Sequence, residues 1–323
     1  MTKLGGGRRQ SLRPIFPWRR GFSRRLNLIR RLVLLLVFIA LASPIYFHLK
    51  LRRFHQMQMA RCGWLGNPPL ICAHGGDSTN AFPNTMGAYH IALRSQVDCI
   101  EIDVSRSSDG VLFALHDRDL QQISRNHTSK VGYFSSHEIR ELHLNHQFQS
   151  GFNDRKIPTI EDSLMLISRS VRQVILDAKV GPPAYEKGLT ENILSVVERT
   201  NCMNCIVWAK SDSLVRDIIR RSANITVGYI VMNDSSAGNR STLLRMKKAV
   251  VVGVYHVLID EKIVKTLHGR NKRVYAWTVD DEVSMKRMLY ERVDGIVTSN
   301  PTLLQQVMLE MRTRCLEEGF SLR

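Results

Sequence analysis

The chain has 323 residues, which is enough for one large domain with a full hydrophobic core. Its hydrophobic content of 44% and charged content of 23% exclude whole-chain disorder, and six cysteines in so long a chain exclude a small disulfide scaffold. A formal net charge of +17 would suit a nucleic-acid-binding protein if the charge were spread over a folded domain.

The charge is concentrated at the N-terminus. Residues 1–76 contain 14 basic residues and no acidic residue, whereas residues 77–323 hold the other 32 basic residues and all 29 acidic ones. The larger part of the chain is therefore nearly neutral, with a net charge of +3. Such asymmetry indicates a terminal segment with a role of its own, and we expect no nucleic-acid partner.

An uncharged apolar segment, residues 32–49, follows the first ten basic residues. It is close to the ~20 residues that a spanning helix needs. Because ten basic residues precede it and four follow, we expect a basic cytoplasmic tail (1–31), a transmembrane signal anchor (32–49) and a lumenal or extracellular remainder. Two alternatives stay open, namely an organelle transit peptide and a signal peptide cleaved at Ala40-Leu41-Ala42.

Asparagine sequons fit the lumenal or extracellular side of a membrane. They begin at Asn126, Asn224, Asn233 and Asn239, and they favour a glycosylated, oxidising compartment. In that environment Cys202-Met203-Asn204-Cys205 forms either a local disulfide or two free thiols. The chain has no second CxxC, so a zinc site is not expected.

Residues 50–69 are expected to form a stalk, and residues 70–323 a single domain in which strands alternate with helices. Nine short apolar segments are predicted strands: 70–74, 99–105, 111–117, 173–179, 205–210, 225–231, 254–259, 273–279 and 294–299. The second and third are separated by a short turn around Ser108-Asp109-Gly110, which indicates a β-hairpin. The other eight predict an α/β fold, a (β/α)8 TIM barrel, with the polar segment 117–160 inserted after the hairpin.

Ionisable side chains gather where four neighbouring predicted strands end. They are His74, Glu101, Asp103, His116, Asp177 and Lys179. Barrel enzymes carry their chemistry at the carboxyl ends of the strands. The i, i+2 spacing of Glu101 and Asp103 puts both carboxylates on one face, and the same holds for Asp177 and Lys179.

These residue types predict phosphoryl transfer on an anionic substrate. Glu101, Asp103 and Asp177 offer the oxygen ligands that Mg²⁺ or Ca²⁺ prefers. His74 and His116 suit acid–base work near neutral pH, and Lys179 adds a fixed positive charge. The sequence has no GxxxxGK[ST], GxGxxG or GxSxG motif, so nucleoside triphosphates, dinucleotides and a serine-esterase mechanism are unsupported.

Residues 70–304 resemble the glycerophosphodiester phosphodiesterase family in the order and spacing of their motifs. The matching segments are His74-Gly75-Gly76, Pro83-Asn84-Thr85, Glu101-Ile102-Asp103-Val104, Asp109-Gly110, Leu115-His116-Asp117, Leu176-Asp177-Ala178-Lys179, Ala276-Trp277-Thr278-Val279 and Asp294-Gly295-Ile296-Val297-Thr298-Ser299-Asn300-Pro301. The resemblance implies hydrolysis of a glycerophosphodiester or lysophospholipid substrate, through a cyclic phosphate, to glycerol 3-phosphate and an alcohol. It does not indicate the head group or the oligomeric state.

The same resemblance implies a role for each site residue. Glu101, Asp103 and Asp177 would hold the divalent cation, His74 and His116 would act as base and acid, Lys179 would pair with a phosphate oxygen, and Trp277 would line the glycerol side.

Three positions depart from the family pattern. Gly75 stands where the family has a phosphate-binding arginine, Pro83 where it has a glutamate, and Asp177 where it has a longer glutamate. Losing an arginine clamp should weaken phosphate binding, unless Arg94 or Arg118 replaces it. A second function class therefore stays open, a catalytically weakened barrel that binds phosphodiester lipids or a protein partner.

Overall fold

The computed structural model describes residues 19–142, 156–232 and 243–321. Within these residues, nine strands form one sheet in the order β1-β9-β8-β7-β6-β5-β4-β2-β3, and a pairing of β1 with β2 closes it into a barrel. The strands are β1 (Leu70–His74), β2 (Cys99–Arg106), β3 (Leu112–Ala114), β4 (Gln173–Ala178), β5 (Cys205–Ala209), β6 (Thr226–Val231), β7 (Val251–Tyr255), β8 (Arg273–Trp277) and β9 (Gly295–Thr298).

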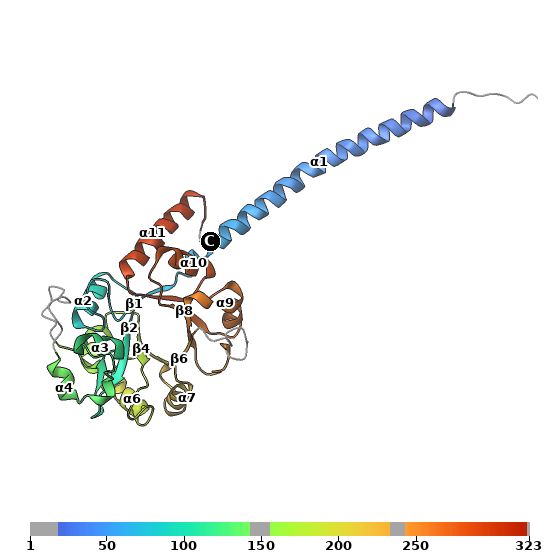
Figure 1. The fold of residues 1–323 in the computed structure, drawn as a ribbon. Coiled ribbons are helices and arrows are strands. Elements are labelled where there is room, and N and C mark those ends of the chain that lie inside the picture. Colours follow the sequence, from blue (N-terminus) through green and yellow to red (C-terminus); the bar gives the residue numbers. More distant parts are fainter. Residues whose placement is uncertain (1–18, 143–155, 233–242, 322–323) are drawn as a thin grey trace, which may run out of the picture. The chain divides into compact units, whose positions relative to one another are not determined.

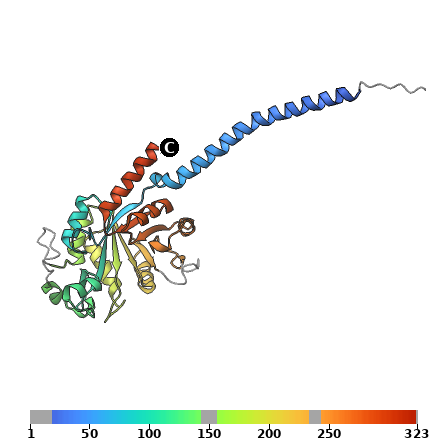
Figure 2. The same cartoon turned by 45° about the horizontal axis from the view of Figure 1, so that its top comes forward.

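The pairing of the strands confirms the predicted (β/α)8 barrel. Eight strands run parallel around it, and β3 pairs antiparallel with β2, so that Val104 lies opposite Ala114. Helices surround the strands in both views of the ribbon (Figures 1 and 2). Because each parallel strand is covered on both sides, its sequence is apolar almost throughout, which is why the strands could be predicted from short apolar runs.

Most helices of the barrel begin at a residue whose side chain caps them, α6 after Gly188 being an exception. Thr85 accepts a hydrogen bond from the Ala88 N–H (3.2 Å), and Asp260 accepts one from the Ile263 N–H (2.7 Å). The α-helices are α2 (Met86–Arg94), α3 (Asp117–Ser124), α4 (Ser136–Glu141), α5 (Ile160–Ile167), α6 (Leu189–Arg199), α7 (Asp212–Arg221), α9 (Glu261–His268), α10 (Glu282–Glu291) and α11 (Pro301–Glu317). Short 3₁₀ helices are η1 (Gly63–Gly66), η2 (Val131–Tyr133) and η4 (His256–Leu258).

Strand β7 differs from its prediction. It spans Val251–Tyr255, whereas the sequence suggested residues 254–259, and η4 follows it directly. Gly253 interrupts the apolar run and hid the start of the strand. The structure gives the reason for this glycine, since a Cβ atom there would lie 2.9 Å from Trp208 Cζ3.

Side chains from alternating strand positions fill the barrel interior. Trp208 and Tyr275 are its large members, and their rings make an edge-to-face contact at 6.4 Å. Cys72 and Cys99 lie side by side on β1 and β2 as free, buried thiols. The packed interior leaves the chemistry to the rim, where the strands end.

The segment after the hairpin has an apolar cluster of its own. It contains α3, η2 and α4, which pack around Leu120, Val131 and Ile139. Residues 143–155 of this segment lie outside the described residues, as do the sequons at Asn233 and Asn239.

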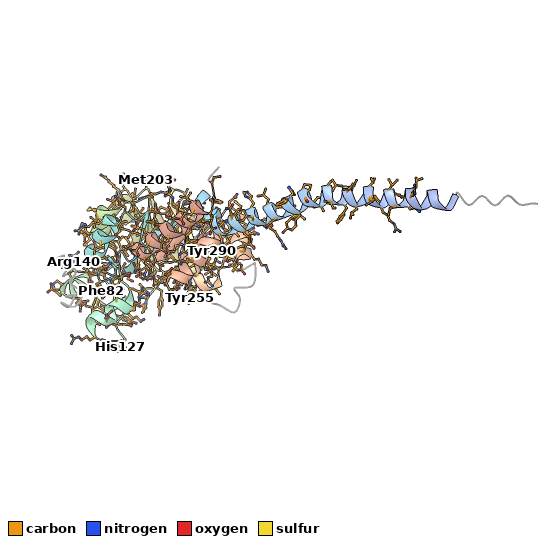
Figure 3. The ribbon with its side chains drawn as sticks, turned by 90° about the horizontal axis from the view of Figure 1, so that it is seen from above. Phe82, His127, Arg140, Met203, Tyr255 and Tyr290 are labelled. Carbon is orange, nitrogen blue, oxygen red and sulfur yellow. A yellow bond between two sulfur atoms is a disulfide. The ribbon has the colours of Figure 1, made fainter. Side chains whose placement is uncertain are left out.

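The N-terminal part of the chain is the helix α1 (Arg19–Cys62). Figure 3 shows side chains projecting from most of its length. Its most apolar 18-residue window has a mean hydropathy of 2.4, and none of that window is buried, so α1 is long and apolar enough to cross a membrane.

The chain divides into two compact units, Met1–Met59 and Ala60–Arg323. The division falls inside the segment expected to be a stalk, because Trp64 and Leu65 of η1 are buried in the barrel unit. Cys62 forms a disulfide with Cys315 of α11, a pairing that the sequence did not suggest. Cys202 and Cys205 form the local disulfide that was one of two expectations for this pair.

Candidate active site

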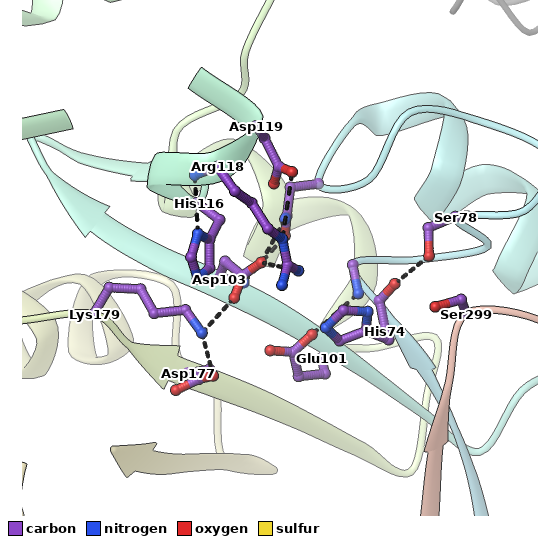
Figure 4. A network of polar contacts seen from close by, with 12 residues as sticks. His74, Ser78, Glu101, Asp103, His116, Arg118, Asp119, Asp177, Lys179 and Ser299 are labelled. Carbon is purple, nitrogen blue, oxygen red and sulfur yellow. Dashed lines mark hydrogen bonds and ion pairs between the residues drawn. The ribbon is translucent and has the colours of Figure 1, made fainter. Parts of the chain in front are cut away.

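The strand register brings the predicted ionisable residues to one end of the barrel. His74 lies opposite Glu101 in the pairing of β1 with β2, and Asp103 lies opposite Asp177 in the pairing of β2 with β4. Lys179 directly follows β4, and His116 lies two residues after the end of β3, so all six side chains face the same rim (Figure 4).

Three of these side chains are close enough to share one cation. Ligand atoms of His74, Glu101 and Asp103 lie within 4.8 Å of one another. The sequence predicted Glu101 and Asp103 together with Asp177, whereas in the structure Asp177 lies on the far side of the Lys179 ammonium group. The carboxylates of Asp103 on β2 and Asp177 on β4 nevertheless both contact that ammonium group.

Lys179 links two of the carboxylates. Its Nζ atom lies 2.6 Å from Asp103 Oδ1 and also forms a short ion pair with Asp177 Oδ2. Burial alone would lower the pKa of Lys179, but the charges of Asp103 and Asp177 outweigh burial and raise it. Conversely, burial would raise the pKa of Asp103, but the positive charge of Lys179 brings it below its ordinary value. Lys179 is therefore a permanent cation at this rim.

At Glu101, in contrast, the effects that disfavour the charged carboxylate outweigh the attraction of Lys179. Burial and repulsion from Asp103 and Asp177 raise its pKa well above the ordinary value. The Asp177 pKa is raised as well, chiefly by burial, and its Oδ1 atom is buried without a hydrogen-bond partner among the described residues. The rim thus holds more carboxylate than its own cations and donors stabilise, which is the usual condition of a cation site.

Backbone and amide groups hold the carboxylates of β2 in place. The Gly75 N–H donates to Glu101 Oε2 (3.0 Å). Asn84 donates from Nδ2 to Asp103 Oδ2 (2.9 Å) and accepts at Oδ1 from the Asp103 N–H (3.0 Å). Asn84 is buried and has a left-handed backbone, with φ of 61°. The sequence placed it in a family motif but assigned it no role.

Burial favours the neutral form of both histidines. Burial lowers the pKa of His116 to about 4, and burial also lowers the pKa of His74. The Arg118 N–H donates to His116 Nδ1 (3.1 Å), which leaves the proton of the neutral ring on Nε2. His74 is thus suited to accept a proton, and His116 presents an N–H donor.

A cavity of about 60 Å³ lies among these residues. Trp277 lines it, together with Trp208, Arg118 and Lys210. The Trp277 ring packs against Tyr255 at 5.7 Å and lies under the Lys210 ammonium group at 5.8 Å, while its Nε1 is buried without a hydrogen-bond partner among the described residues. Lys210 was missed by the sequence reasoning, since one lysine after a strand carries no distinctive signal.

Comparison with known proteins agrees with this geometry. Residues 74–303 match the model of the glycerophosphoryl diester phosphodiesterase family. The chain belongs to this family. It is 58% identical over 321 residues to the glycerophosphodiester phosphodiesterase GDPD4 of Arabidopsis thaliana, covering 99% of this chain and 95% of that protein. It is 28% identical over 236 residues to a glycerophosphodiester phosphodiesterase of Caldanaerobacter subterraneus, covering 73% of this chain and 96% of that protein.

A solved structure with the same fold is a phosphodiesterase of Oleispira antarctica in complex with the product sn-glycerol-3-phosphate. The TM-score is 0.61 at 20% identity, over 74% of this chain and 96% of that one. The match to the family model and the 58% identity to a named glycerophosphodiester phosphodiesterase show that the chain is an enzyme of the glycerophosphoryl diester phosphodiesterase family.

Proposed function

We propose that this enzyme hydrolyses glycerophosphodiesters or lysophospholipids in a reaction that depends on Mg²⁺ or Ca²⁺ and uses His74 and His116. With a glycerophosphodiester, the products are glycerol 3-phosphate and an alcohol. The observation that carries the proposal is the convergence of two histidines, three carboxylates and Lys179 at one rim of the barrel.

The residues at the rim fit a divalent cation. Glu101 and Asp103 offer hard oxygen donors, and Asp177 Oδ1, which is buried without a hydrogen-bond partner among the described residues, is a further oxygen at the same rim. When bound, such a cation supplies Lewis-acid polarisation of a phosphoryl oxygen.

The histidines divide the proton transfers. His74 accepts the proton of the substrate hydroxyl as the new O–P bond forms. His116, protonated beside the negative charge of the bound phosphodiester, donates its Nε2 proton to the oxygen of the alcohol whose P–O bond breaks. Water then opens the cyclic phosphate, with the proton transfers reversed. Lys179 faces the phosphate with a fixed positive charge, and the free Nε1–H of Trp277 is available to a glycerol hydroxyl.

The N-terminal helix supports a membrane-anchored enzyme. We propose residues 1–31 as a cytoplasmic tail, 32–49 as the span, and the barrel on the lumenal or extracellular side. Two disulfides and the exposed sequon at Asn126 support an oxidising, glycosylating compartment. A glycosidase-sensitive size shift that Asn126→Gln reduces, with the N-terminus retained on the mature chain, is expected. A chain shortened by the length of residues 1–42 would instead identify a cleaved signal.

The decisive experiment measures turnover by the full-length chain in detergent. We expect release of glycerol 3-phosphate from at least one of glycerophosphocholine, glycerophosphoethanolamine and glycerophosphoglycerol, with loss of release in EDTA and recovery on adding Mg²⁺ or Ca²⁺. Asp217→Asn, a surface acid of α7, is the matched control for Asp177→Asn, which should raise the cation concentration needed for half-maximal rate by about tenfold or more.

A panel that also contains lysophosphatidylcholine completes the test. Absence of turnover on every diester and lysolipid, with saturable binding of one of them, would replace the proposal with the weakened, lipid-binding barrel. The observation that favours this second candidate is Gly75, because the family's phosphate-binding arginine is missing there.

A further inference from the structure

Arg118 lies where a phosphate-binding group is needed. It belongs to the first turn of α3, two residues after His116, and it lines the same cavity as His74, His116 and Lys179. Figure 4 shows its side chain reaching over Asp103 into the space between the two histidines. Its positive charge contributes to the lowered pKa of both His74 and His116, after the larger effect of burial, which agrees with a position near both rings.

The guanidinium group of Arg118 has N–H donors that form no hydrogen bond within the described part of the chain. Its Nη2 atom lies 3.9 Å from Asp103 Oδ2, and its Nε atom lies 3.6 Å from Asp119 Oδ1. Both distances exceed the 2.7–3.2 Å of a hydrogen bond. Among the described residues no acceptor lies within hydrogen-bonding distance of this guanidinium group, and the side chain is 54% exposed. By contrast, Lys179 is already engaged with two carboxylates.

The charges at the rim also suit this use of Arg118. Together with a divalent cation, the cationic side chains Lys179, Arg118 and Lys210 exceed the charge of the three carboxylates, so the cavity can hold an anionic phosphodiester. Without Arg118, the planar, bidentate donor that best fits two phosphate oxygens would be missing.

Other candidates for this role fit less well. Arg94 is in the last turn of α2, the helix that runs from the rim back to the opposite end of the barrel. Lys210 lines the cavity, but it offers a single ammonium group, which lies over the Trp277 ring.

We propose that Arg118 binds the substrate phosphate in place of the arginine that the family carries at the position of Gly75. The inference rests on the proposed function for its substrate, but it concerns a different residue and has its own readout. Asp119, buried beside the Nε atom of Arg118, acts as a positioning residue for it.

The test compares Arg118→Ala and Arg118→Lys with the full-length enzyme. Binding of sn-glycerol 3-phosphate in the presence of Mg²⁺ is followed by tryptophan fluorescence, since Trp208 and Trp277 line the cavity. We expect the Kd for this probe, and the KM for a hydrolysed diester, to rise about 10- to 100-fold in Arg118→Ala, with a smaller rise in Arg118→Lys. Low concentrations of guanidinium chloride should partly restore binding to Arg118→Ala.

Arg140→Ala is the matched control, because Arg140 is an exposed arginine of the neighbouring helix α4 that lies at the outer surface (Figure 3). An unchanged Kd for glycerol 3-phosphate in Arg118→Ala, accompanied by tighter Mg²⁺ binding, would overturn the inference and make Arg118 a counter-ion of Asp103. A rise in Kd in Lys210→Ala alone would overturn it as well. If the unsubstituted enzyme hydrolyses no diester, the proposed function fails, while the binding measurement still decides the role of Arg118.

Discussion

Pro83 fills the space beside Gly75. A Cβ atom built on Gly75 would lie 3.0 Å from Pro83 Cβ and 3.2 Å from the backbone nitrogen of Asn84, and Gly75 has a φ of +62°. The two positions at which this chain lacks the family's arginine and glutamate are therefore adjacent, and a side chain at position 75 would crowd Pro83 and require a left-handed backbone. An arginine substituted at position 75 would therefore be sterically disfavoured. This favours a phosphate-binding arginine elsewhere in the site, such as Arg118.

Gly75→Ala tests this crowding. We expect a loss of about 1–3 kcal/mol in the free energy of unfolding, because the added Cβ requires a left-handed backbone and crowds Pro83. Urea unfolding measures the loss. Combining it with Pro83→Gly should return the part due to crowding but not the part due to φ, and strict additivity of the two changes would contradict the crowding.

Substitution of His74 or of His116 is expected to lower the rate without changing the Mg²⁺ dependence. Each substitution by glutamine should lower kcat by about 10²–10⁴-fold, the usual contribution of general acid–base catalysis. His116→Gln should leave the Mg²⁺ dependence of the rate unchanged. The same result for His74→Gln supports its role as the base, whereas a large rise in the Mg²⁺ requirement would make His74 a ligand, as its proximity to Glu101 and Asp103 allows.

Because of Asp119, the free energy of unfolding should fall as the pH rises from about 4 through 6. Burial, followed by repulsion from Asp103, raises its pKa from 3.8 to about 6. The folded state keeps this proton up to about pH 6 while the unfolded chain releases it near 3.8, so the group favours the folded state below pH 4 and that contribution is lost as the pH rises through 6.

Asp119→Asn is therefore expected to raise the free energy of unfolding by about 1–3 kcal/mol at pH 8, with the gain disappearing near pH 4. Urea titrations at the two pH values measure it. A gain of equal size at both values would show that the substitution acts through packing and not through the carboxylate charge.

The disulfide between Cys62 and Cys315 should contribute much of the stability of the barrel unit. It closes a loop with a sequence separation of 253, and the chain-entropy relation gives about 5 kcal/mol for a loop of that length. Cys62→Ser with Cys315→Ser should lower the melting temperature accordingly, and a reducing agent should have the same effect on the unsubstituted protein. The control is Cys202→Ser with Cys205→Ser, whose separation of 3 predicts about 2 kcal/mol. Equal losses from the two pairs would contradict this account.

Local patterns in the sequence determined the barrel and the identity of the candidate site. Alternating apolar strands and helices predict eight parallel strands, and the i, i+2 spacing of Glu101 with Asp103 and of Asp177 with Lys179 determines which face their side chains share. The carboxyl ends of parallel strands lie at one rim of the barrel, irrespective of the conformation of the loops between them. For that reason the convergence of His74, His116 and the acids could be expected before the structure was known.

The tertiary structure decided what depends on contacts between segments distant in the chain. The Asn84 clamp on Asp103, the pairing of Cys62 with Cys315, and the approach of Pro83 to Gly75 follow from how loops fold over the rim, and no periodic pattern encodes a loop. The start of β7 was not predicted because Gly253 interrupts its apolar run. Only the tertiary structure explains this glycine, since a Cβ atom there would lie too close to the Trp208 ring. Arg118 is one of many arginines in the sequence. Its position over Asp103, between two half-buried histidines, distinguishes it from the others.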